Sequence, residues 1–194
     1  MTYSAFMTLQ KAIPFLLIPL FARFFTKEEM GFYTLYQVLY SILIPIVTLS
    51  LDSALSVVFF KLDKERFAIY LTNILLFAFV LFLSFITLSL IFGNWLAQLL
   101  NFPFFWLLLV VIAVLPQFLI NILLALYRNQ QQPFKYGSLA CSASLVTISI
   151  SLIFVFIGNM SWQGMILGLL FGNSVVALFC IFQLWRNGFI ILKK

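Results

Sequence analysis

The chain has 194 residues, of which 64% are hydrophobic and 8% are charged, and its formal net charge is +6. So few polar side chains could not cover the surface of a soluble fold, and apolar runs of about 20 residues, long enough to cross a bilayer, recur along the chain. The composition predicts an integral membrane protein, and basic residues without interleaved stacking aromatics exclude nucleic-acid binding.

Charged and turn-forming residues divide the sequence into six predicted membrane-spanning helices, which form a single all-α bundle over residues 1–194. The helices cover residues 3–22, 31–60, 67–92, 103–127, 136–157 and 164–185. A signal peptide is the alternative interpretation of the first, but a small-x-small cleavage pattern is missing. We expect a kink at Pro45 in the second helix, and Pro103 suits the first turn of the fourth.

The distribution of Lys and Arg predicts the orientation of the bundle. The two loops and the tail that follow even-numbered helices contain eight of these residues, whereas the loops on the other side contain two. Because cytoplasmic loops are enriched in positive charge, we expect both ends of the chain in the cytoplasm. Trp95, Trp106 and Trp162 would then lie at the outer interface, as in an aromatic belt.

The loop before the second helix contains Glu28 and Glu29, which could be interpreted as ligands of a cation. The spacing Thr26-x-x-Glu29 instead matches a capping box, with both acids near the positive end of the helix dipole. The chain has no histidine and no GxxxxGK[ST] phosphate-binding loop. We therefore expect no metal site, no cofactor and no enzymatic activity.

Two ionisable residues, Lys11 and Asp52, fall inside predicted spans, where an unpaired charge is costly. With a rise of about 1.5 Å per residue, both lie roughly 10–12 Å from the cytoplasmic ends of their helices. Consecutive helices usually pack as neighbours, so the two side chains could form an ion pair. Alternatively, Lys11 extends to the interface while Asp52 faces an inner vestibule unpaired. The sequence leaves both interpretations open.

Polar residues elsewhere in the spans could line a cavity with these two charges, or could form hydrogen bonds between helices. They are Gln10, Gln37, Asn73, Gln117, Asn121 and Asn173. In the sixth helix, Gly164, Gly168 and Gly172 recur every four residues, which places them on one face and allows close approach of a neighbour. This face could pack against the fifth helix or form a homodimer.

Three stretches of the chain resemble a known family. They are IPLFARFFTKEEMGFYTLY, LSLDSALSVVFFKLDKERF and LYRNQQQPFKYGSL. With the glycine-rich sixth helix, they resemble the N-terminal half of the oligosaccharide flippases, also called polysaccharide biosynthesis or O-antigen export proteins, of the multidrug/oligosaccharidyl-lipid/polysaccharide exporter superfamily. The chain departs from the family at Ser50, where Gly is frequent, and near Val57, where a basic residue is frequent.

The resemblance implies translocation of an oligosaccharide linked to undecaprenyl pyrophosphate from the cytoplasmic to the outer leaflet of the bacterial inner membrane. In such transporters two helical bundles face a central cationic cavity, so Lys11 and Arg23 would be candidates to contact the pyrophosphate. We expect the chain to be a truncated N-terminal half. Alternatively, a second polypeptide or a second copy of this chain supplies the other bundle.

Two other functions remain open at this stage. One is half of a multidrug/cation antiporter in which Asp52 is the ion-coupled acid, although that family typically has more acids inside the membrane. The other is a non-transporting membrane scaffold, for which helix packing alone would suffice.

Overall fold

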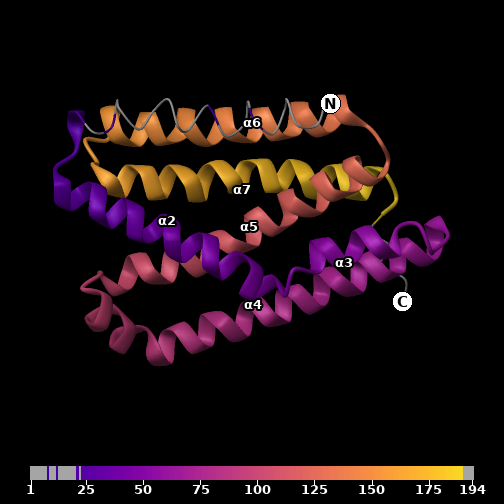
Figure 1. Cartoon of the computed structure of the whole chain (residues 1–194), viewed down its shortest axis with the longest axis horizontal. Coiled ribbons are helices and arrows are strands. Elements are labelled where there is room, and N and C mark those ends of the chain that lie inside the picture. Colours follow the sequence, from indigo (N-terminus) through magenta and orange to yellow (C-terminus); the bar gives the residue numbers. More distant parts are fainter. Residues whose placement is uncertain (1–7, 9–11, 13–20, 22, 190–194) are drawn as a thin grey trace.

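The structure, a computed structural model, describes residues 8, 12, 21 and 23–189, and every regular element among them is helical (Figure 1). The elements are α2 (Lys27–Thr48), α3 (Leu51–Val58), α4 (Lys64–Leu100), α5 (Phe104–Asn129), α6 (Pro133–Leu152), the π-helical turn η1 (Ile153–Ile157) and α7 (Trp162–Arg186). Five helices in this part of the chain, counting α6 and η1 together, are long and apolar enough to cross a membrane. The all-α polytopic fold is confirmed; the expected span 3–22 lies almost entirely outside the described residues.

The central helix of the bundle is α5, which contacts α2, α3, α4, α6 and α7. Figure 1 shows it crossing obliquely between α4 and α7. Apart from Gln117 and Asn121 on one face, its sequence is apolar between Phe104 and Tyr127, which is typical of a helix buried by neighbours on several sides. In its first half Val110 belongs to a core cluster with Tyr36 of α2, and in its second half Phe118 belongs to another with Leu71 of α4. The two clusters hold the other helices around α5.

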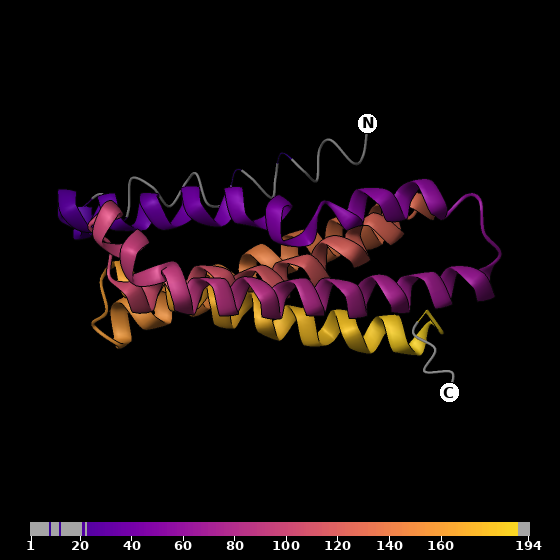
Figure 2. The same ribbon diagram turned by 90° about the horizontal axis from the view of Figure 1, so that it is seen from below.

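The connections between helices alternate between the two ends of the bundle. Residues 59–63, residues 130–132 and the end of α7 meet at one end, and the loops 101–103 and 158–161 lie at the other (Figures 1 and 2). We call the first of these the basic end. Its cationic side chains are Lys61, Lys64, Arg66, Arg128, Lys135 and Arg186, against the carboxylates of Asp63 and Glu65.

The start of α2 follows the predicted capping box. The backbone N–H of Glu29 donates to the Thr26 hydroxyl (3.3 Å), and the Glu29 carboxylate accepts a hydrogen bond from the Thr26 backbone N–H (2.8 Å). The capping box is confirmed. Within the described residues, no group of histidine, cysteine or acidic side chains is arranged to hold a metal ion.

The second predicted span is interrupted after Thr48, and the kink expected at Pro45 stays a prediction. Helix α2 continues through Pro45 to Thr48, and the chain then passes through Leu49 (φ 48°) and Ser50 (φ 50°), both in the left-handed region, before α3 begins. Pro45 has no backbone N–H, so the turn before it lacks one hydrogen bond, and α2 ends three residues later at Thr48. The interruption therefore follows the proline.

The backbone at Ser50 gives a testable consequence. Glycine adopts positive φ without the steric cost that a Cβ imposes. We predict that Ser50→Gly raises the free energy of unfolding of the purified protein by about 0.5–1 kcal/mol. The control Ser53→Gly, inside α3, should lower it by about 0.5–1 kcal/mol. Denaturant titration in detergent measures both, and a loss of stability at both positions would contradict the assignment.

Helices α6 and α7 are in close contact along their length, and the glycines of α7 lie at this contact. A Cβ on Gly168 would overlap Ser151 of α6, and a Cβ on Gly172 would lie 2.5 Å from the Cα of Thr147. A Cβ on Gly164 would lie 3.0 Å from the backbone of Phe154. The missing side chains thus let the two backbones approach, which is a common way for helices to pack in membranes.

This packing predicts opposite effects for two glycine-to-alanine changes. Gly168→Ala should lower the free energy of unfolding by about 1–3 kcal/mol, because the neighbouring backbone must move. Gly31→Ala has nothing within 4 Å of the added Cβ, and it should raise stability by about 0.5–1 kcal/mol through helix propensity. Unfolding in detergent compares the two, and equal effects would contradict close α6–α7 packing.

Candidate functional site

A partly open cavity of about 280 Å³ lies between α2, α5, α6 and α7, and Phe21 also lines it. Among its described lining residues none carries a charge. The polar ones are Tyr33, Gln37, Tyr40, Gln117, Ser144, Thr147, Ser151 and Asn173. Apolar side chains such as Met30, Ile120 and Leu169 complete the wall. The cavity therefore combines hydroxyl and amide groups with an apolar surface.

Asn173 of α7 is the centre of a hydrogen-bond network at this cavity, and its side chain is buried. Its amide nitrogen donates to the Tyr40 hydroxyl (3.1 Å) and to the Gln117 amide oxygen (3.0 Å). Its amide oxygen accepts from the Thr147 hydroxyl (3.1 Å). One side chain thereby links α7 to α2, α5 and α6.

The network extends along α5. The Tyr40 hydroxyl also donates to the Gln117 amide oxygen (3.2 Å), and the Gln117 amide nitrogen donates to the Asn121 amide oxygen (2.9 Å). Gln117 and Asn121 lie one turn apart on the same face of α5. Because hydrocarbon offers no hydrogen bonds, polar groups at this depth are stable only where the bundle supplies partners.

The spacing of residues along each helix determines where these polar groups lie. Tyr33, Gln37 and Tyr40 are spaced by four and three residues, so α2 presents them on one face. The Gln37 amide nitrogen donates to the Tyr33 hydroxyl (2.8 Å). On the opposite side, the missing side chain of Gly172 lets α6 approach closely enough for Thr147 to reach Asn173.

Hydrogen-bonding capacity remains after these contacts are counted. Tyr33 accepts from Gln37, and its own hydroxyl hydrogen has no partner among the hydrogen bonds of the described residues. The Ser144 and Ser151 hydroxyls donate to carbonyls one turn earlier in α6, which leaves their lone pairs as acceptors. The cavity can therefore both donate to and accept from a neutral, hydroxyl-bearing ligand.

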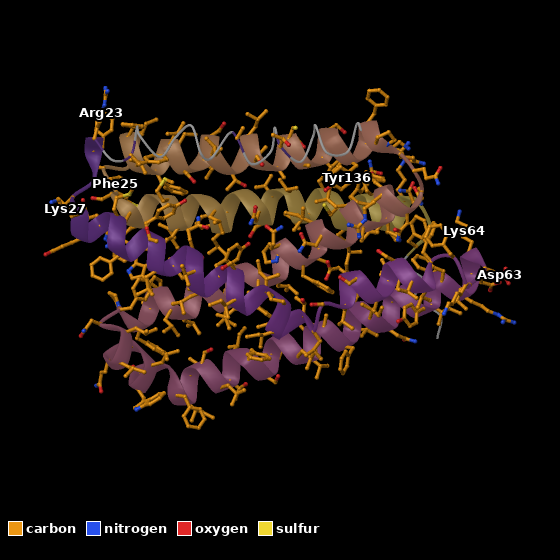
Figure 3. All side chains as sticks on the ribbon, viewed as in Figure 1. Arg23, Phe25, Lys27, Asp63, Lys64 and Tyr136 are labelled. Carbon is orange, nitrogen blue, oxygen red and sulfur yellow. The ribbon has the colours of Figure 1, made fainter. Side chains whose placement is uncertain are left out.

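The sequence-predicted polar residues are only partly brought together. Gln117 lines the cavity, and Asn121 is bonded to it. Asn73 is exposed on α4, a helix that contributes nothing to the described lining. Arg23 is exposed at the end opposite the basic end and points away from the helices (Figure 3). Gln10 and Lys11 lie outside the described residues.

Asp52 does not line the cavity among its described residues. It is half-buried in the first turn of α3, immediately after the interruption of the span. An acidic side chain at this place interacts favourably with the positive end of the helix dipole. In residues 23–189 no ion pair with Asp52 occurs, and its proposed pairing with Lys11 stays a prediction.

Five polar cavity residues, Tyr33, Tyr40, Ser144, Thr147 and Ser151, were not predicted from sequence. The spacing of Tyr33, Gln37 and Tyr40 on one helical face could have indicated the two tyrosines as cavity residues. Tyrosines in a membrane protein are, however, usually interpreted as interfacial or core residues. No sequence pattern distinguished Thr147, because threonine occurs throughout these helices.

Long apolar helices around a polar interior define the class: this is an all-α, multi-pass membrane protein that lies in a lipid bilayer. The sequence model of a family described as "Polysaccharide biosynthesis protein" matches residues 1–194. The chain therefore belongs to the polysaccharide biosynthesis protein family, which is associated with export-related transport. Comparisons with curated proteins and with solved structures gave no match.

The network predicts a stability difference between two asparagines. Asn173→Ala removes three hydrogen bonds between helices and should lower the free energy of unfolding by about 2 kcal/mol, at about 0.6 kcal/mol for each bond. Asn73→Ala, on the exposed side of α4, should change it by less than about 0.5 kcal/mol. Denaturant titration in detergent tests this, and equal losses would refute the central role of Asn173.

Proposed function

We propose that the chain is one bundle of a transporter that moves a lipid-linked oligosaccharide, such as an O-antigen or capsular repeat unit, across the bacterial inner membrane. The observation that carries the proposal is the cavity of hydroxyl and amide groups inside a membrane-spanning bundle of this family. A sugar offers many neutral donors and acceptors, which such a lining can satisfy. In this proposal the cavity holds part of the oligosaccharide.

The charge distribution supports an orientation for this transport. The basic end has six cationic side chains and two carboxylates, whereas residues 23–29 at the other end contain two cationic side chains, Arg23 and Lys27, and two carboxylates, Glu28 and Glu29. By the positive-inside rule, the basic end would lie in the cytoplasm. Arg23 would then contact the pyrophosphate only after it has reached the outer leaflet, and Lys11 would contact it within the membrane.

The placement of Asp52 weighs against an antiporter that couples transport to this acid. In such a protein the acid would be expected among the polar groups of the cavity, but the described lining contains no carboxylate. A scaffold function would need only the packing role of the polar network. The two remaining functions differ in whether the free hydrogen-bonding groups of the cavity bind a ligand.

Binding by the purified full chain distinguishes them. The ligands are undecaprenyl-pyrophosphate-linked oligosaccharide and undecaprenyl pyrophosphate without sugar, and native mass spectrometry measures their dissociation constants. We predict that Tyr33→Phe, which keeps the ring and removes one hydroxyl, weakens binding of the sugar-bearing lipid by about tenfold. Binding of the sugar-free lipid should not change.

Thr34→Val is the matched control, since Thr34 is exposed on the same helix and its hydroxyl donates to the Met30 carbonyl. It should leave both dissociation constants unchanged. If the wild-type chain binds both lipids equally and Tyr33→Phe alters neither constant, the cavity does not recognise the sugar and the scaffold function is favoured.

A further inference from the structure

A second pocket, of about 470 Å³, lies at the basic end of the bundle. It is formed where α4 and α6 begin and where α5 and α7 end, together with the turn before α4. Its charged lining residues are Lys64 and Lys135, and amide side chains and aromatic rings surround them. None of the described lining residues is acidic. This pocket is separate from the cavity inside the bundle.

The two lysines occupy positions that disfavour a cation. Lys64 is the first residue of α4 and Lys135 is the third residue of α6, so both lie at the positive end of a helix dipole. The preceding residues, Asp63 and Gln132, make no side-chain capping hydrogen bond. Asp63 and Glu65 are adjacent to Lys64 in sequence, but neither lines the pocket. The local field is therefore positive at the pocket.

Neither lysine has a carboxylate as a direct partner in the described part of the chain. No ion pair of Lys64 or Lys135 occurs in residues 23–189, and the Lys64 ammonium lies 5.9 Å from the centroid of the Phe189 ring. In addition, the side-chain amide oxygen of Gln132 is buried without a hydrogen-bond partner. The pocket thus offers two cations to an anion and one buried acceptor to a donor.

Aromatic residues place this pocket at the level of lipid headgroups. Phe60, Phe134 and Trp185 are all strongly exposed near the same end of the bundle. Of these, Trp185 is the informative one, because Trp side chains at the ends of spanning helices are enriched at the membrane–water interface. Figure 3 shows Lys64 next to Asp63 at this same end of the bundle.

We propose that this pocket binds the headgroup of an anionic glycerophospholipid, with its phosphate at Lys64 and Lys135 and a headgroup hydroxyl donating to the Gln132 amide oxygen. Phosphatidylglycerol has both groups. Phosphatidylethanolamine fits less well, because its ammonium adds a third positive charge beside the two lysines. This site does not depend on the proposed transport function.

The test uses the purified, delipidated full chain in an uncharged detergent. Native mass spectrometry measures binding of short-chain phosphatidylglycerol and phosphatidylethanolamine, and isothermal titration measures binding of inorganic phosphate. We expect phosphatidylglycerol to bind at least tenfold more tightly than phosphatidylethanolamine. The double variant Lys64→Gln/Lys135→Gln should lose this preference, and Lys64→Arg/Lys135→Arg should retain it, which also controls for misfolding.

Lys61→Gln is the matched control, because Lys61 is exposed in the same turn and does not line the pocket. It should leave the preference intact. Equal binding of the two lipids, or an equal loss in Lys61→Gln, would mean that general surface charge attracts anions and would overturn the proposal. Inorganic phosphate binding as tightly as phosphatidylglycerol would overturn the assignment to a lipid.

Discussion

The side chain of Asn173 is the point on which the interior of this bundle depends. In a bilayer the apolar surfaces of helices gain little by turning away from lipid, so close packing and hydrogen bonds must hold the helices together. Asn173 donates to α2 and α5 and accepts from α6. The same contacts that satisfy its buried amide bring polar groups of four helices to one cavity. Stability and the candidate site therefore share one set of interactions.

This interaction in turn depends on backbone approach between α6 and α7. Gly172 has no side chain at the place where Thr147 lies, and Gly168 has none beside Ser151. A larger residue at either position would separate the helices and remove Thr147 from Asn173. The glycines offer no side chain to a ligand, yet they determine whether the wall formed by α6 belongs to the cavity.

The fold was largely predictable from the sequence, and the site only partly. Long apolar segments and the Thr26–Glu29 capping box depend on residues near one another in the chain, so their patterns are visible locally. The interruption at Leu49 and Ser50 was not predicted, because Pro45 weakens a helix without determining where the chain leaves it. Gln117 and Asn121 were recognised as polar residues in a span, but the other partners of Gln117, Tyr40 and Asn173, come from other helices, and only the packing brings them together.

The central claim is that a sugar occupies the cavity between α2, α5, α6 and α7. The most direct measurement places a photoreactive diazirine side chain at Ile148, which lines the cavity, or at Leu145, which is exposed on the same helix. The chain is then irradiated in membranes with a lipid-linked oligosaccharide. The account predicts crosslinks to the sugar from position 148 and few from position 145. Crosslinks to the sugar from position 145 alone would contradict it.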